Sequence, residues 1–179
     1  MPLFRSTWRV VPWAALLWTL PALAGNDSKL ACEIRENGTP ASGTVALLKD
    51  GAEVARGVCG KPIAVQAGDY TAVFSLDGAL DGPELRLPLT AAAGKTSKLN
   101  ADFATGLLEV KIKSQGRDTA GMAVIRKADH QVGTLGSGVA AHLSVGTYQV
   151  VARYRAQQKT FENVAITAGQ RTQLDVSFE

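Results

Sequence analysis

The chain has 179 residues, 20% of them charged, and a formal net charge of +3 at pH 7 from 19 basic and 16 acidic side chains. Arg5 and Arg9 lie in an N-terminal targeting pattern, and without them the balance is 17 basic to 16 acidic side chains. The calculated basicity therefore belongs largely to the targeting segment and does not indicate nucleic-acid binding, which requires basic residues clustered on one face. All three tryptophans lie within residues 8–18, so the rest of the chain lacks the aromatic platform most often used for sugars and single strands.

Residues 1–24 have the three parts of a signal peptide: a basic start, an apolar run over residues 10–20, and small residues at Ala22 and Ala24. A membrane-spanning helix needs about 20 apolar residues. The apolar run is shorter and contains Pro12, so retention as an anchor is the weaker alternative. We therefore expect cleavage after Ala24, no stable membrane span afterwards, and a periplasmic or secreted protein.

The remainder of the chain is an internal repeat. A shift of 78 positions aligns residues 30–74 with 108–152 without a gap, and a three-residue difference in one loop then changes the shift to 75. The identities include Gly and Tyr at turn-like positions, where chance similarity between apolar strands would not place them. The matched pairs are Leu30/Leu108, Ile34/Ile112, Gly38/Gly116, Gly43/Gly121, Lys49/Lys127, Val54/Val132, Gly60/Gly138, Gly68/Gly146, Tyr70/Tyr148, Val73/Val151, Leu99/Leu174 and Phe103/Phe178.

Both copies are predicted to be all-β, with residues 29–104 as the first domain and 105–179 as the second. In the second copy, residues 108–113 and 172–178 alternate apolar and polar side chains, which is typical of half-buried strands. Further strands are expected at 122–126, 148–154 and 161–166, with turns at 115–116, 129–130 and 168–170. The linker 104–106 is short, so we expect a restricted orientation and an elongated rod.

Several motifs resemble the carboxypeptidase regulatory-like (transthyretin-like, prealbumin-like) sandwich family of bacterial exported proteins. The resemblance implies two tandem seven-stranded immunoglobulin/transthyretin-like β-sandwiches. It also implies a role as spacer, adhesion stalk or binding accessory, with no catalytic residues to carry over. The motifs are Gly106-x-Leu108-x-Val110, Leu143-Ser144-Val145-Gly146-Thr147-Tyr148-x-Val150, Val164-x-Ile166-x-Ala168-Gly169-Gln170 and Leu174-x-Val176-x-Phe178, with first-copy counterparts Val65-Gln66-Ala67-Gly68-Asp69-Tyr70 and Ala93-Gly94-Lys95.

The Gly-x-Tyr step at Tyr70 and Tyr148 is predicted to be architectural. Glycine permits the positive φ of a tight turn that enters a strand. The tyrosine ring is then expected to be buried while its hydroxyl reaches the backbone, as in a tyrosine corner.

Cys32 and Cys59 are expected to form a structural disulfide. Both lie in the first copy, and Val110 and Ser137 replace them together in the second copy. An exported compartment permits a disulfide. A redox-active pair would more often have the C-x-x-C spacing, and a zinc site would need further ligands nearby.

The loop 77–84 is the longest divergent segment and is the candidate interaction loop, with Asp77, Asp81 and Glu84 as its carboxylates. Calcium binding is an open alternative there, although the EF-hand spacing is missing. His130 and His142 have no third ligand at metal spacing, and Ser137 lacks a nucleophile-elbow context. We therefore expect no metal, no cofactor and no catalytic residue.

The expected function is that of a non-enzymatic structural or interaction module. It would bind a protein or cell-envelope partner through loops or sheet edges. The alternative is a carbohydrate-binding accessory, in which Tyr154 and Phe161 stack on a glycan if they are exposed.

Overall fold

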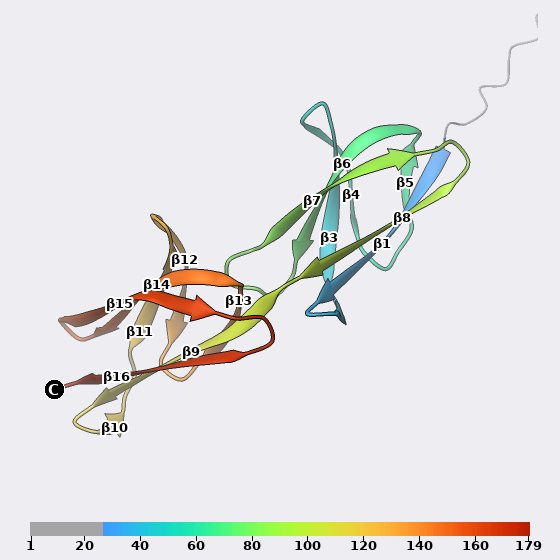
Figure 1. The fold of residues 1–179 in the computed structure, drawn as a ribbon. Helices are drawn as coiled ribbons and strands as arrows, with labels where there is room; N and C mark the ends of the chain where they lie inside the picture. Colours follow the sequence, from blue (N-terminus) through green and yellow to red (C-terminus); the bar gives the residue numbers. More distant parts are fainter. Residues whose placement is uncertain (1–26) are drawn as a thin grey trace, which may run out of the picture.

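The computed structural model describes residues 27–179, so the predicted signal peptide at 1–24 lies outside the described residues. Residues 27–179 are all-β and contain sixteen strands. None of the elements in this range is a helix long and apolar enough to cross a bilayer. The two repeats follow one another along an elongated molecule, each with two four-stranded sheets (Figure 1).

In the first repeat, β1 is the central strand of one sheet. It pairs in parallel with β8 and antiparallel with β2 and β5, and the second sheet has the order β4-β3-β6-β7. The strands are β1 (Asp27–Glu36), β2 (Thr39–Ala41), β3 (Gly43–Lys49), β4 (Ala52–Val58), β5 (Ile63–Gln66), β6 (Gly68–Leu76), β7 (Glu84–Ala91) and β8 (Thr96–Phe103).

The second repeat has the same topology. β9 pairs in parallel with β16 and antiparallel with β10 and β13, and the other sheet has the order β12-β11-β14-β15. The strands are β9 (Thr105–Ser114), β10 (Arg117–Asp118), β11 (Met122–Lys127), β12 (His130–Gly136), β13 (Ala140–Ser144), β14 (Gly146–Tyr154), β15 (Gln157–Ile166) and β16 (Arg171–Phe178).

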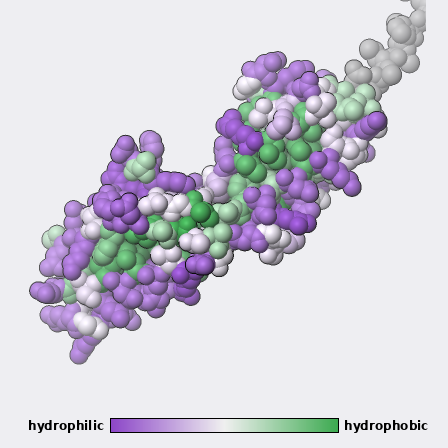
Figure 2. All heavy atoms as spheres, in the orientation of Figure 1, coloured by the Kyte–Doolittle hydropathy of each residue, from purple (hydrophilic) through white to green (hydrophobic). Residues whose placement is uncertain are grey.

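Each repeat buries its own apolar cluster between its two sheets. The first cluster runs from Leu30 to Phe103 in sequence, and the second runs from Leu108 to Phe178. The alternation predicted for the strands is present: in β16, Val176 and Phe178 are buried while their neighbours Asp175 and Ser177 are exposed. Full burial of one large aliphatic side chain stabilises a fold by about 1.5–3 kcal/mol. The apolar side chains visible in Figure 2 gather within each lobe.

Two kinds of turn explain why the glycines recur in both repeats. The hairpin after β1 places Asn37 and Gly38 at φ of 51° and 78°, as a two-residue type I′ turn requires. Gln115 and Gly116 repeat this turn after β9. Gly68 and Gly146 begin β6 and β14 at φ of 150° and 151°, which confirms the positive φ expected before the two tyrosines.

Two details differ from the sequence-based expectation. Each repeat has eight strands where seven were predicted, because a short return strand, β2 or β10, follows the first hairpin. The linker is also shorter than 104–106: Thr105 and Gly106 already belong to β9, so only Ala104 lies between β8 and β9. The linker between the repeats is thus a single residue, and the repeats lie end to end (Figure 2).

Candidate functional site

The loop between β6 and β7 lies against the second repeat and contacts it through Ala79, Leu80 and Asp81. We call residues 77–83 the joint loop. Ala79 forms an isolated bridge with His142, and the Leu80 amide donates a hydrogen bond to the His142 carbonyl oxygen at 2.8 Å. Ala79 packs on the first apolar cluster, whereas Leu80 packs on the second. Adjacent residues of the loop therefore join the two cores.

The Leu80 side chain fits where the second repeat has no side chain. A Cβ added to Gly133 would lie 2.5 Å from the Leu80 side chain, so any larger residue there would displace it. Val132 beside Gly133 also packs against the second cluster. We call the surface that receives the loop the joint socket. It consists of the five residues that contact the loop and of Val132 and Leu143 beside them; the five are Lys127, Gly133, His142, Ser144 and Tyr148.

We call the contact between the joint loop and the joint socket the joint. Asp81 makes its polar interactions. Its carboxylate oxygens lie 2.7 Å from the Tyr148 hydroxyl and 3.1 Å from the Ser144 amide, and both groups donate to it. The Lys127 ammonium is 3.7 Å away, and only 4% of the Asp81 side chain is exposed. A nearly buried carboxylate requires such partners, because removing its donors would leave an unpaired charge out of water.

The contact between Asp81 and Tyr148 shifts the pKa of both side chains. Burial raises the pKa of the Asp81 carboxyl, but the hydrogen bonds from Tyr148 and Ser144 and the charge of Lys127 outweigh it, so the pKa lies below its ordinary value. Burial also raises the pKa of the Tyr148 phenol, and the adjacent Asp81 carboxylate raises it further. Tyr148 therefore remains a protonated donor to Asp81 at neutral pH.

A second contact lies at the strand junction. The Asn37 side-chain amide donates to the Thr105 carbonyl oxygen at 3.0 Å and accepts from the Thr105 amide at 3.1 Å. Glu36 accepts a hydrogen bond from the Thr105 hydroxyl and lies 2.6 Å from Nδ1 of His142. Thr105 is fully buried. The first turn of the first repeat thus holds the first residue of β9 from two sides.

The three carboxylates of the candidate interaction loop do not converge. Asp81 faces the second repeat, Asp77 is exposed, and Glu84 lies 3.5 Å from Arg86 at the start of β7. Within residues 27–179, no three His, Cys, Asp or Glu side chains are grouped to hold a metal ion. His130 is exposed at the start of β12, and His142 contacts Glu36 while 49% of its side chain is exposed.

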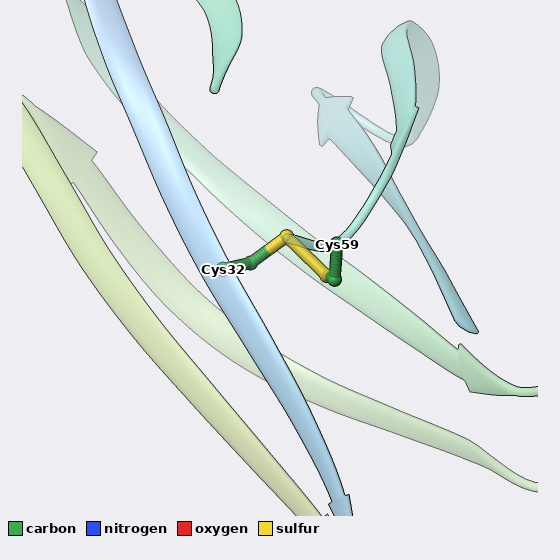
Figure 3. Close-up of a disulfide and its surroundings, with 2 residues drawn as sticks. All are labelled: Cys32 and Cys59. Carbon is green, nitrogen blue, oxygen red and sulfur yellow. A yellow bond between two sulfur atoms is a disulfide. The ribbon is translucent and has the colours of Figure 1, made fainter. Parts of the chain in front are cut away.

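The predicted disulfide is present. Cys32 on β1 is bonded to Cys59 after β4, at a sequence separation of 27 (Figure 3). At the corresponding place in the second repeat, the Ser137 hydroxyl accepts a hydrogen bond from the Ile112 amide at 2.9 Å. Both repeats therefore tie the loop after their fourth strand to their first strand, one covalently and one by a hydrogen bond.

Both tyrosine corners are confirmed. The Tyr70 hydroxyl lies 2.9 Å from the carbonyl oxygen of Gln66, and the Tyr148 hydroxyl lies 2.9 Å from that of Ser144. Only the second corner also holds Asp81. One signal of this difference is visible in the sequence, the three-residue excess in the loop 77–84, but nothing there indicates the partner of that loop.

The aromatic pair considered for glycan stacking is partly covered. Tyr154 and Phe161 both pack against the second apolar cluster. The Tyr154 ring lies 5.8 Å from the Phe178 ring, and the Arg155 guanidinium lies 5.1 Å from the Tyr154 ring centre. These contacts occupy surface that a stacked sugar would need.

Replacing Tyr148 with Phe should destabilise the protein more than the same change at Tyr70. Tyr148→Phe removes a donor from a nearly buried carboxylate and should cost about 1–3 kcal/mol, whereas Tyr70→Phe removes one neutral hydrogen bond, about 0.5–1.5 kcal/mol. Urea unfolding of the two variants measures the difference. Equal losses would show that the Tyr148–Asp81 contact contributes nothing to stability.

The joint should weaken in acid. Because the pKa of Asp81 is lower in the folded protein, its contribution is complete above the unfolded value of about 4 and is lost as pH falls through the folded value. The measurement is the free energy of unfolding between pH 7 and pH 3, compared with Asp81→Asn. The wild-type advantage over Asp81→Asn should shrink as the pH falls below about 4; an advantage that does not change with pH would contradict this assignment.

Comparisons with known proteins give no family. No protein-family model matches the chain, and no curated protein matches it. Among solved structures, 85% of the chain aligns with 34% of the Bacillus anthracis TIE protein at 13% identity and a TM-score of 0.37, so the chain spans about a third of that protein. It also aligns over 85% with 92% of a candidate adhesin from Bacteroides ovatus, at 9% identity and a TM-score of 0.41.

A third similar structure is the pilus adhesin SpaC from Lactobacillus rhamnosus GG, which aligns over 84% of this chain and 31% of its own length, at 12% identity and a TM-score of 0.30. The resemblance to the carboxypeptidase regulatory-like family stays a prediction. Residues 27–179 form a β-rich protein in which the joint loop of one repeat lies on the other.

Proposed function

We propose that this chain is an exported, non-enzymatic interaction protein built from two β-sandwich domains, at 29–104 and 105–179, held as one rigid unit. It presents loops or sheet edges to a protein or cell-envelope partner. The observation that carries the proposal is the joint, in which Leu80 and Asp81 of the first repeat are held by the second repeat.

Rigidity is useful for binding or spacing and serves no evident catalytic purpose. A pair of domains that is already fixed in orientation loses less conformational freedom when a partner binds both of them. Here a single residue, Ala104, separates the two repeats. Hydrogen bonds of Asn37 with Thr105 and of Asp81 with Tyr148 join the repeats at two further places, which supports a fixed orientation.

The titratable groups of the joint support a non-enzymatic role. Asp81, Tyr148 and Lys127 satisfy one another, and the Asp81 carboxylate is almost fully enclosed by the contact. A general acid or base must reach its substrate within hydrogen-bonding distance. These groups are instead placed to hold two parts of the same chain together.

Export is supported by the disulfide and by the N-terminal pattern. Disulfides persist in the periplasm and outside the cell and are rare in reducing compartments. Cys32–Cys59 belongs to the first apolar cluster, as a structural disulfide would. We place the protein in the periplasm or outside the cell, after cleavage following Ala24.

Affinity capture from the protein's own envelope extract tests the proposal. The purified protein serves as bait, and captured proteins are quantified by mass spectrometry against bait that has been reduced and unfolded. We expect one envelope component to be enriched by the folded bait alone. Failure to enrich any component, or turnover of an envelope substrate by the purified protein, would overturn the proposed function.

A further inference from the structure

The first repeat has a pocket of about 320 Å³ at the end of the sandwich that lies away from the joint. Gln66 in its lining pairs with Asp27 at the start of β1, whereas the joint lies at the other end of β1, near Glu36. The pocket is lined by Lys49, Val54, Ala55, Ala64, Val65, Gln66 and Tyr70.

Each lining residue is the repeat counterpart of a residue of the joint socket, 78 positions earlier in the chain. We call this pocket the open socket. The pairs are Lys49/Lys127, Val54/Val132, Ala55/Gly133, Ala64/His142, Val65/Leu143, Gln66/Ser144 and Tyr70/Tyr148. The second repeat thus shows what this surface receives when it is filled: an apolar side chain followed directly by a carboxylate.

The open socket retains the groups that hold the joint loop. The Tyr70 hydroxyl lies 2.9 Å from the Gln66 carbonyl oxygen, the same distance as the Tyr148 hydroxyl from the Ser144 carbonyl oxygen. The ammonium group of Lys49 lies near Gly68 as that of Lys127 lies near Gly146. Val54 is 53% exposed. Within residues 27–179, no carboxylate lies within ion-pair distance of Lys49, whereas Lys127 has Asp81. The surface therefore presents a cation, a phenol and an uncovered apolar side chain together.

We propose that the open socket binds a turn of a partner protein in which an apolar residue precedes an aspartate or glutamate. The carboxylate lies against Lys49, the Tyr70 hydroxyl and the amide of Gln66, as Asp81 lies against their counterparts. The apolar side chain covers Val54. This inference rests on the proposed function, because it names the chemistry of the partner that the interaction module binds.

Within residues 27–179, no other loop repeats the shape of the joint loop: Ala128-Asp129 has an apolar residue before an aspartate, but it is a tight two-residue turn between β11 and β12, whereas the joint loop has seven residues. Residues 1–26 contain no aspartate or glutamate. In a second copy, Leu80 and Asp81 are already held in the joint of that copy. The corresponding loop at the far end of the second repeat is Arg155-Ala156, which has no carboxylate. The occupant is therefore a different protein, stacked on the first repeat as the first repeat stacks on the second.

One difference between the two sockets limits the size of the apolar side chain that the open socket can hold. Gly133 of the joint socket leaves room for Leu80, and a Cβ at that position would lie 2.5 Å from the Leu80 side chain. The open socket has Ala55 at the position of Gly133, so the Ala55 Cβ already occupies part of the space that Leu80 fills in the joint socket. The partner's apolar residue is consequently smaller than leucine, such as alanine or valine.

Titration of the purified protein with cyclic peptides tests the inference. One peptide carries the turn Gly-Ala-Leu-Asp-Gly-Pro, the second has Ala in place of Leu, and the third has Ala in place of Leu and Asn in place of Asp. Chemical-shift changes at the amides of 49–55 and 64–70 report binding.

We expect the Ala-Asp peptide to bind the wild type. The Leu-Asp peptide should bind Ala55→Gly about tenfold tighter than it binds the wild type, and the Asn peptide should bind about tenfold more weakly than its Asp counterpart.

Charge reversal provides the matched control. Lys49→Glu should weaken binding of the Ala-Asp peptide about tenfold, whereas Lys98→Glu, which makes the same change of charge on β8, should leave it unchanged. Shifts confined to the second repeat, equal effects of the two reversals, or no saturable shift with any peptide would overturn the inference.

The capture experiment separates the two proposals. If an envelope protein is captured equally by Lys49→Glu and Lys98→Glu, the open socket is not its binding site, while the proposed function stands. If the peptides bind as expected but the folded bait enriches no envelope component, the proposed function fails and the chemistry of the open socket stands.

Discussion

Replacing Cys32 and Cys59 together with alanine is expected to lower the free energy of unfolding of the first repeat by about 3–4 kcal/mol. The disulfide closes a loop with a sequence separation of 27, and the chain-entropy model gives a stabilisation of that size. The second repeat has no cysteine, so its stability should not change directly. Urea unfolding with repeat-resolved amide exchange measures both effects.

The second repeat supplies a graded control for this experiment. Cys32→Val with Cys59→Ser installs the residues found at 110 and 137, where the Ser137 hydroxyl accepts a hydrogen bond from the Ile112 amide. This pair should recover part of the stability that the double-alanine protein loses, by about 0.5–1.5 kcal/mol. A double-alanine protein as stable as the oxidised wild type would show that the disulfide adds nothing to the fold.

Gly133→Val is expected to open the joint and to leave both repeats folded. The new side chain would occupy the space of Leu80, which a Cβ alone would approach to 2.5 Å. Overpacking of this kind costs about 1–3 kcal/mol, and expulsion of the joint loop relieves it. The two repeats should then tumble with separate correlation times in ¹⁵N relaxation measurements.

Ala55→Val is the matched control, because it enlarges the corresponding residue of the first repeat, which lines a pocket rather than packing on the joint loop. It should leave the relaxation behaviour of the wild type unchanged. If Gly133→Val also tumbles as one body, Leu80 is not what couples the repeats, and the polar contacts of Asp81 with Tyr148 and of Asn37 with Thr105 would have to do so.

The architecture within each repeat was largely predictable, because it depends on local patterns that occur twice. The alternation in residues 172–178 gave β16, and the Gly-x-Tyr step gave both tyrosine corners. Both cysteines are absent from the second copy, and this shared absence predicted the disulfide. Comparison of the copies separated these shared features from chance similarity. The short strands β2 and β10 were missed because two or three residues are too few to show a period.

The joint was not predictable from the sequence, because its contacts occur once and join residues far apart. Asp81 and Tyr148 are separated by 67 positions, and nothing in the local pattern of either residue indicates the other. The sequence marked the loop 77–84 only as divergent. Gly133 carried a signal that was not used: it replaces Ala55 of the other copy, in a strand where glycine weakens the fold unless another group approaches closely.

Residual dipolar couplings of the backbone amides test most directly the claim that the two repeats form one rigid unit. Couplings from 29–104 and from 105–179 would be fitted separately to the structure in one aligning medium. The joint predicts that both sets give the same alignment tensor in the wild type and different tensors in Gly133→Val. Two different tensors in the wild type would contradict the rigid joint.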